Sequence, residues 1–209
     1  MQAPLPRRRT SRPIPGAEQP LRGLFVDRFG TLLESPGSAG FRPFSPAAIP
    51  GAAIDALFRL SRNGWNVYLV GNEDAVANGK VSDEEWLRFE RELLEHLARH
   101  GVSIKRNYAC LDDIAGKGAH KKLSVFRFPD TGVFFHAQQF DHIELRRSYL
   151  IGDSTLEIAA AERSGLKTIG VRTGFGCRDE SLHVAPDLTV DSVVEALELF
   201  LKSDQFALR

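Results

Sequence analysis

The sequence predicts a single α/β domain of the doubly wound, Rossmann-like type with a central parallel sheet. From Leu24 onward, short apolar runs alternate with longer amphipathic segments, which is typical of consecutive β-α units. A chain of 209 residues is long enough for one well-buried core and too short for two ordinary domains with a linker. Each apolar run ends in polar residues or glycine, so we expect a ligand site where the carboxyl ends of the strands meet.

The domain is predicted to occupy residues 21–209, after a disordered tail at residues 1–20. The tail is rich in proline and arginine, and such a composition buries too little apolar surface to offset the loss of chain entropy. Within the domain, strands are predicted at 24–26, 66–70, 149–151 and 168–171.

Helices are predicted between these strands from apolar periodicity and from end signals. Residues 52–63 place a stripe of apolar side chains on one face and end at Gly64, which suits a helix C-terminus. Ser82 and Glu85 have the spacing of a capping box, which predicts a helix over 82–100. Two further helices are expected at 156–164 and 191–202.

The amino-acid composition limits the kinds of binding partner and the cellular compartment that we expect for this protein. Lys plus Arg and Asp plus Glu both number 27, so the formal net charge is zero and we predict no binding to nucleic acid or to membranes. No run reaches the roughly eighteen apolar residues of a membrane span, and no signal peptide is visible. The two cysteines are too few for a disulfide framework, and a cytoplasmic protein is expected.

Three carboxylates stand at the ends of predicted strands or just beyond them. Asp27 ends the first strand, where a carboxylate can attack a phosphoryl group and help to hold a cation. Asp153 follows the strand at 149–151, and Glu157 lies one helical turn later. Asp27, Asp153 and Glu157 therefore form a candidate Mg²⁺ site, although Asp153 alone is equally consistent with a helix N-cap.

Five segments occur in a familiar order, at 27–32, 49–52, 70–79, 129–132 and 148–154. Together they resemble the haloacid dehalogenase superfamily, and within it the D,D-heptose 1,7-bisphosphate phosphatases and the histidinol phosphatases. The resemblance implies a haloacid dehalogenase-like fold without a large cap domain. It also implies a phosphoric monoester hydrolase in which Asp27 is the catalytic nucleophile and Mg²⁺ is the cofactor.

The chain departs from the family at the residue that transfers protons. In the family the first motif reads Asp-x-Asp-Gly-Thr, and its second Asp is the general acid and base. Phe29 occupies that position here. Because a benzyl side chain transfers no proton, a rate loss of about 10²- to 10⁴-fold is expected.

Two phosphate-binding side chains of the family are also replaced. Gly71 stands where the family has Thr or Ser, and Phe128 stands where it has Lys. The remaining candidates for phosphate binding are Gly71 through its backbone N–H, Asn72, and Arg127 as a substitute cation, with Lys121 and Lys122 as the alternative to Arg127. We expect Mg²⁺ to bind more weakly than in the active enzymes, and the two phenylalanines to make the pocket more apolar.

The zinc-binding loop of the family is degenerate in this chain. Many members hold a structural zinc ion through Cys-x-His and Cys-x-Cys, and only Cys110 remains of these ligands. Asp112, Ser124 and Phe126 occupy the other three positions. We therefore predict no zinc.

Three functions remain open from the sequence. The first is a phosphatase-like protein with impaired or lost phosphomonoester hydrolysis, which binds a small phosphorylated ligand or a protein partner. The second is an active Mg²⁺-dependent phosphohydrolase that forms an aspartyl-phosphate on Asp27. The third is a scaffold or assembly protein, for which a homodimer through the 82–100 helix would be a natural arrangement.

Overall fold

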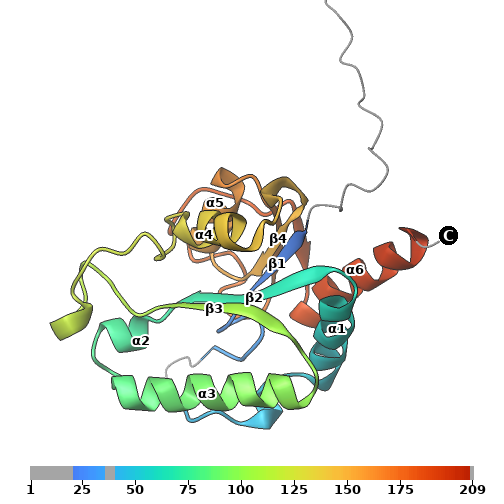
Figure 1. The fold of residues 1–209 in the computed structure, drawn as a ribbon. Helices are drawn as coiled ribbons and strands as arrows, with labels where there is room; N and C mark the ends of the chain where they lie inside the picture. Colours follow the sequence, from blue (N-terminus) through green and yellow to red (C-terminus); the bar gives the residue numbers. More distant parts are fainter. Residues whose placement is uncertain (1–20, 36–40, 208–209) are drawn as a thin grey trace, which may run out of the picture.

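The computed structural model describes residues 21–35 and 41–207, with side chains as far as Lys202, so the predicted tail lies outside the described residues. Six parallel strands form one sheet in the order β3-β2-β1-β4-β5-β6 (Figure 1). The predicted α/β class with a central parallel sheet is confirmed. The strands are β1 (Arg22–Asp27), β2 (Trp65–Asn72), β3 (Ile104–Cys110), β4 (Tyr149–Gly152), β5 (Lys167–Val171) and β6 (Leu188–Val190).

The four predicted strands are confirmed as β1, β2, β4 and β5. The prediction missed β3 and β6, which form the two edges of the sheet. β3 has the polar sequence IKRNYAC and is only partly buried, while β6 has three residues. Edge strands are commonly short or charged, so the long apolar runs that reveal central strands are missing from them.

Helices cover both faces of the sheet (Figure 1). α4 and α5 lie on one face, and α1, α3 and α6 lie on the other, in agreement with the two separate clusters of buried side chains. The prediction missed α2 and α4. The helices are α1 (Gly51–Arg62), α2 (Asp74–Ala77), α3 (Asp83–Arg99), α4 (Gly132–Asp141), α5 (Thr155–Arg163) and α6 (Val193–Ala207).

Alternation along β1 distributes its side chains between the two faces. Leu24 and Val26 join the cluster under α1, α3 and α6, and Phe25 joins the cluster under α4 and α5. The Phe25 ring stacks on Tyr68 with 4.5 Å between centroids and meets Phe134 edge-on at 4.9 Å. All three β1 residues are fully buried, so β1 is anchored on both faces and its last residue has a fixed position.

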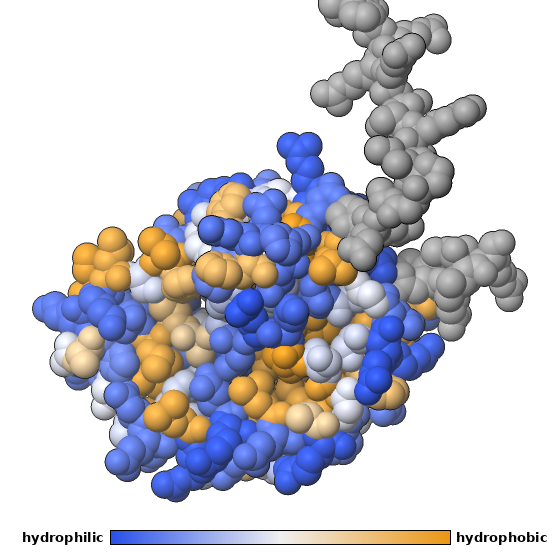
Figure 2. Space-filling view, in the orientation of Figure 1, coloured by the Kyte–Doolittle hydropathy of each residue, from blue (hydrophilic) through white to orange (hydrophobic). Residues whose placement is uncertain are grey.

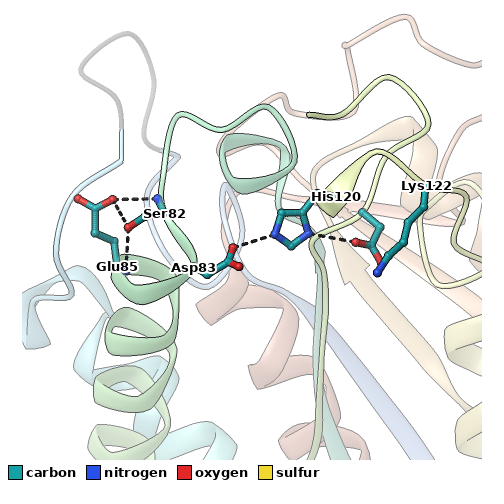
Figure 3. Close-up of polar contacts among 6 residues, drawn as sticks. Ser82, Asp83, Glu85, His120 and Lys122 are labelled. Carbon is teal, nitrogen blue, oxygen red and sulfur yellow. Dashed lines mark hydrogen bonds and ion pairs between the residues drawn. The ribbon is translucent and has the colours of Figure 1, made fainter. Parts of the chain in front are cut away.

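The start of α3 has the predicted capping box (Figure 3). The backbone N–H of Glu85 donates to the Ser82 hydroxyl at 3.3 Å, and the backbone N–H of Ser82 donates to the Glu85 carboxylate at 2.9 Å. Gly101 follows the helix with a φ of 75°, a conformation that glycine adopts without steric cost. The local sequence therefore defines both ends of α3.

A long connection, residues 111–131, joins β3 to α4 and carries exposed apolar side chains. Ile114, Leu123 and Val125 are 68%, 75% and 60% exposed. Figure 2 shows hydrophobic residues among hydrophilic ones on this side of the molecule. His120 links the connection to α3 through two contacts (Figure 3). Its Nε2 lies 2.7 Å from Asp83, the first residue of α3, and its Nδ1 lies 3.1 Å from Asp112 within the connection itself.

We expect this contact to weaken as the pH rises. Hydrogen bonds to Asp83, and then to Asp112, raise the pKa of His120 in the folded protein. Its stabilising effect is therefore complete below the unfolded pKa of about 6.5 and is lost as the pH rises through the higher folded value. His120→Gln should lower the free energy of unfolding by about 0.5–1 kcal/mol at pH 6 and by less at pH 8, measured by urea denaturation. The exposed His183 provides the matched control, His183→Gln; an equal loss for His120→Gln at both pH values would contradict the assignment.

Candidate functional site

The polar ends of the central strands meet at one edge of the sheet, as expected. Asp27 is the last residue of β1, Gly71 lies near the end of β2, and Asp153 directly follows β4. They line a common pocket of about 370 Å³. Among the described residues that line it there is no lysine or arginine, whereas six are acidic: Asp27, Glu73, Asp74, Asp153, Glu157 and Asp179.

The three predicted metal ligands lie together in the lining of this pocket. Asp27, Asp153 and Glu157 each place one carboxylate oxygen within 4.8 Å of the other two, and all three side chains are buried. Oδ2 of Asp27 and Oε2 of Glu157 are buried without a hydrogen-bond partner. Oδ2 of Asp153 accepts a hydrogen bond of 2.6 Å from the backbone N–H of Phe175, which orients that carboxylate.

Burial and mutual repulsion disfavour the ionised forms of these carboxyl groups. Burial, followed by repulsion from Asp153, raises the pKa of Asp27 well above its usual range. Burial and repulsion from Asp27 do the same to the pKa of Glu157, and burial raises the pKa of Asp153 to about 6. A divalent cation would relieve this repulsion, and Mg²⁺ prefers hard oxygen ligands. The donor set and its orphaned oxygens therefore fit Mg²⁺.

Phe29 lies at the side of the pocket and belongs to an aromatic cluster. Its ring centroid lies 5.4 Å from Phe89, 6.4 Å from Phe41 and 6.5 Å from Trp86. The Phe29 ring is therefore held in position by van der Waals contacts with other aromatic rings. At the position where the family has its proton-transferring Asp, the chain therefore presents a hydrocarbon surface.

A buried ion pair fills the space above Gly71. Arg28 is 0% exposed, and its Nη1 donates to Oε1 of Glu73, which is 4% exposed. A Cβ atom at Gly71 would lie 3.1 Å from Arg28 Nη1, 3.1 Å from Glu73 Oε1 and 3.4 Å from Asp27 Oδ1. Glycine at position 71 therefore makes room for the ion pair, and a Thr or Ser side chain would press against it.

Burial raises the pKa of Glu73 to about 7, although the positive charge of Arg28 acts in the opposite direction. The sequence analysis did not identify Arg28 or Glu73 as site residues. The available signal was a charged residue directly after the strand end at Asp27, and another shortly after Gly71. It does not reveal the pairing, because the two residues are 45 positions apart.

The structure places Asn72 and Arg127 in contact with other protein groups. The Asn72 amide donates to the carbonyl of Phe128 and accepts from its N–H, both at 2.9 Å. One guanidinium nitrogen of Arg127 lies 2.6 Å from both Asp74 and Asp113. A role in phosphate binding for Gly71, Asn72 and Arg127 stays a prediction.

Only one of the two phenylalanines lines the pocket, and the expectation of a pocket more apolar than that of an active phosphatase stays a prediction. Phe128 is 2% exposed and packs in the core with Phe134, at 5.8 Å between centroids, and it does not line the pocket. Phe29 contributes an apolar wall to a pocket that six acidic side chains also line. The prediction that Phe128 lies at the site is therefore wrong: its position matches the family's lysine in the sequence, but packing against Phe134 places its ring in the core.

Asp179 is a further pocket residue that the sequence analysis missed. Its carboxylate accepts from the backbone N–H of Thr155 at 2.8 Å and from the Thr155 hydroxyl at 2.7 Å. Asp179 therefore satisfies one backbone donor at the start of α5, where a negative charge is favourable. It is separated from Thr155 by 24 residues, so no local pattern indicates the contact.

The four positions of the degenerate zinc motif lie around one surface pocket. Cys110, Asp112, Ser124 and Phe126 all line it, together with His120. The Cys110 thiol donates to the Asp112 carbonyl at 3.5 Å, and Asp112 also contacts His120 and Lys122. The loop keeps its geometry through these polar contacts, and the absence of zinc stays a prediction.

Comparison with known proteins places this site in a family. The HAD-hydrolase-like family model, where HAD denotes haloacid dehalogenase, matches residues 125–196. The D-glycero-β-D-manno-heptose-1,7-bisphosphate 7-phosphatase of Vibrio cholerae is 33% identical over 151 residues, which cover 71% of this chain and 81% of the relative. The enzyme of the same name from Haemophilus influenzae is 28% identical over 175 residues, covering 83% and 94%.

Solved structures show the same fold. The D,D-heptose 1,7-bisphosphate phosphatase of B. bronchiseptica, complexed with magnesium and phosphate, superimposes with a TM-score of 0.72 at 19% identity, covering 88% of this chain and 99% of that one. A putative HAD-like phosphatase from Mesorhizobium loti gives a TM-score of 0.67 at 25% identity, covering 87% and 88%. The Asp27 strand end, the Asp153 motif and these similarities agree: the chain belongs to the haloacid dehalogenase-like family, in the group that contains the heptose bisphosphate phosphatases.

Proposed function

We propose that this protein is a Mg²⁺-binding member of the family in which hydrolysis of phosphate monoesters is impaired or lost. The observation that carries the proposal is the Phe29 ring, which packs against Phe41, Phe89 and Trp86 at the position of the general acid and base. Without a proton donor, the leaving group departs as an alkoxide, and the attacking water has no base. Binding of a phosphorylated ligand would then be the main function of the site.

Asp27, Asp153 and Glu157 are the residues that would hold Mg²⁺. When bound, the ion supplies charge neutralisation for a phosphoryl group. Asp27 keeps the position of a nucleophile, and Phe175 holds Asp153 in place through its backbone N–H. We propose weaker metal binding than in the active relatives once a phosphorylated ligand is present, because without the family's lysine the anionic ligand that would share the ion is held less firmly. None of the described residues that line the pocket is a lysine or an arginine.

The test is hydrolysis of a panel of phosphate monoesters that includes heptose bisphosphate and histidinol phosphate, with Mg²⁺. We expect turnover at least about 10²-fold below that of the Vibrio cholerae relative measured alongside. Asp27→Asn identifies the part of the turnover that belongs to this site, and the exposed Asp55→Asn on α1 is the matched control. Turnover near that of the relative, lost in Asp27→Asn and kept in Asp55→Asn, would overturn the proposal.

A second candidate function is slow hydrolysis with a different proton donor. Glu73 lines the same pocket as Asp27, and burial raises its pKa to about 7, which suits proton transfer near neutral pH. In this case Glu73→Gln would lower the turnover that depends on Asp27 by about 10²-fold or more. Unchanged turnover in Glu73→Gln would exclude Glu73 as the donor.

A further inference from the structure

We infer that Arg28 is the anion-binding residue of this site and that Glu73 occupies it as an internal anion, so that a phosphoryl group must compete with Glu73 for the guanidinium. The inference rests on the proposed function, because the competing anion is the phosphoryl group of its ligand. It assigns to Arg28 a role that the family's Lys and Thr or Ser would otherwise fill.

The position of Arg28 relative to Asp27 supports this role. Arg28 Nη1 and Asp27 Oδ1 lie 3.1 and 3.4 Å from the same point, the place of an absent Cβ at Gly71. The guanidinium and the Asp27 carboxylate are therefore close neighbours. Because Arg28 is fully buried and does not line the pocket, a phosphoryl group at Asp27 would reach it only by displacing Glu73. No side chain at position 71 separates the two groups, since that residue is glycine.

The guanidinium is held in place from several sides. Its Nη2 donates to Oδ1 of Asn107, whose own amide donates to Glu90 at 2.6 Å. Its carbon lies 5.3 Å from the centre of the Trp86 ring, and its Nε is buried without a hydrogen-bond partner. A preorganised guanidinium with a free donor is well suited to a planar carboxylate or to a phosphate, because it binds both in the same way.

Glu73 is the carboxylate that takes this place in the absence of a ligand. Its Oε1 accepts from Arg28 Nη1, and the residue also lines the pocket. Arg127 is another cation near this edge, and Asp74 and Asp113 already neutralise it. Removing the charge of Glu73 should therefore release Arg28 for an external anion, whereas removing the charge of Asp74 tests Arg127 instead.

The experiment titrates inorganic phosphate into the full-length protein at saturating Mg²⁺, by calorimetry. Glu73→Gln keeps an acceptor for Arg28 and loses the charge, and it should tighten phosphate binding by about tenfold or more. Asp74→Asn removes one charge from the same pocket and should change the affinity by less than about threefold. Adding Arg28→Gln to Glu73→Gln should abolish the gain.

An unchanged affinity in Glu73→Gln, an equal gain in Asp74→Asn, or a gain that survives Arg28→Gln would each overturn the inference. Should Glu73→Gln fail to fold, a measurement on the natural protein decides: saturating phosphate should shift the side-chain Nε–H NMR signal of Arg28 and not that of Arg127, and the opposite result would refute the role of Arg28. Failure of the proposed function would be seen in other measurements. It would appear as turnover that depends on Asp27, or as a calorimetric titration of Mg²⁺ that shows no binding.

Discussion

Asp27→Asn is expected to stabilise the metal-free protein by about 1–3 kcal/mol while removing most of its response to Mg²⁺. The physical reason is the crowding of three buried carboxylates, which raises the pKa of Asp27, Asp153 and Glu157 through burial and repulsion. The neutral amide removes one like charge and also one metal ligand. Thermal and urea unfolding, each with EDTA and with excess Mg²⁺, measure both effects.

The natural protein should gain about 2–3 kcal/mol from Mg²⁺ at a hundredfold excess over its dissociation constant. Asp55→Asn, a change of the same kind on the exposed face of α1, should behave like the natural protein in both conditions. If Asp27→Asn lost stability in EDTA, or kept the full Mg²⁺ response, the three carboxylates would not act as one site.

Arg28→Met is expected to lower the free energy of unfolding by about 3–5 kcal/mol at neutral pH. The substitution leaves Glu73 buried with no opposite charge, and burial already raises the pKa of Glu73 to about 7. The double variant Arg28→Met/Glu73→Met removes both charges and should be clearly more stable than Arg28→Met alone. Urea denaturation of the natural protein, of both single variants and of the double variant gives the four free energies of unfolding that make up a double-mutant cycle.

A matched control for this cycle is the ion pair of Arg172 and Asp191, whose side chains are 55% and 78% exposed. Arg172→Met should change the free energy of unfolding by less than about 1 kcal/mol, because water screens an exposed pair. Additive losses in the Arg28 and Glu73 variants would mean that the two side chains do not interact as described.

The metal ligands were predictable from sequence because topology determines where they meet. In a parallel sheet with helical crossovers, the carboxyl ends of neighbouring strands lie at the same edge, so Asp27 and Asp153 converge once β1 and β4 are recognised as strands. Glu157 follows from the helical turn after Asp153, and the capping box at Ser82 depends on residues three positions apart. These inferences need only local patterns and one rule of topology.

The rest of the site depends on packing between distant segments. Whether Phe29 points into the pocket or away from it is decided by Phe41 and Phe89, and neither contact has a local signature. The same holds for the contact of Asp179 with Thr155 and for the pairing of Arg28 with Glu73. The resemblance to the family placed Phe128 at the site, whereas packing against Phe134 buries it in the core.

The two hydrogen bonds from Asn72 to residue 128 involve only main-chain atoms of that residue. The path of the chain at this point is therefore insensitive to which side chain position 128 carries, so drift from lysine to phenylalanine, or back, leaves these two bonds in place. Position 71 behaves differently, since a hydroxyl-bearing side chain there would press against Arg28 and Glu73. Restoring the family's side chains therefore meets a different obstacle at each position: an ammonium group at position 128 would be buried among core residues, and a hydroxyl-bearing side chain at position 71 would crowd the ion pair.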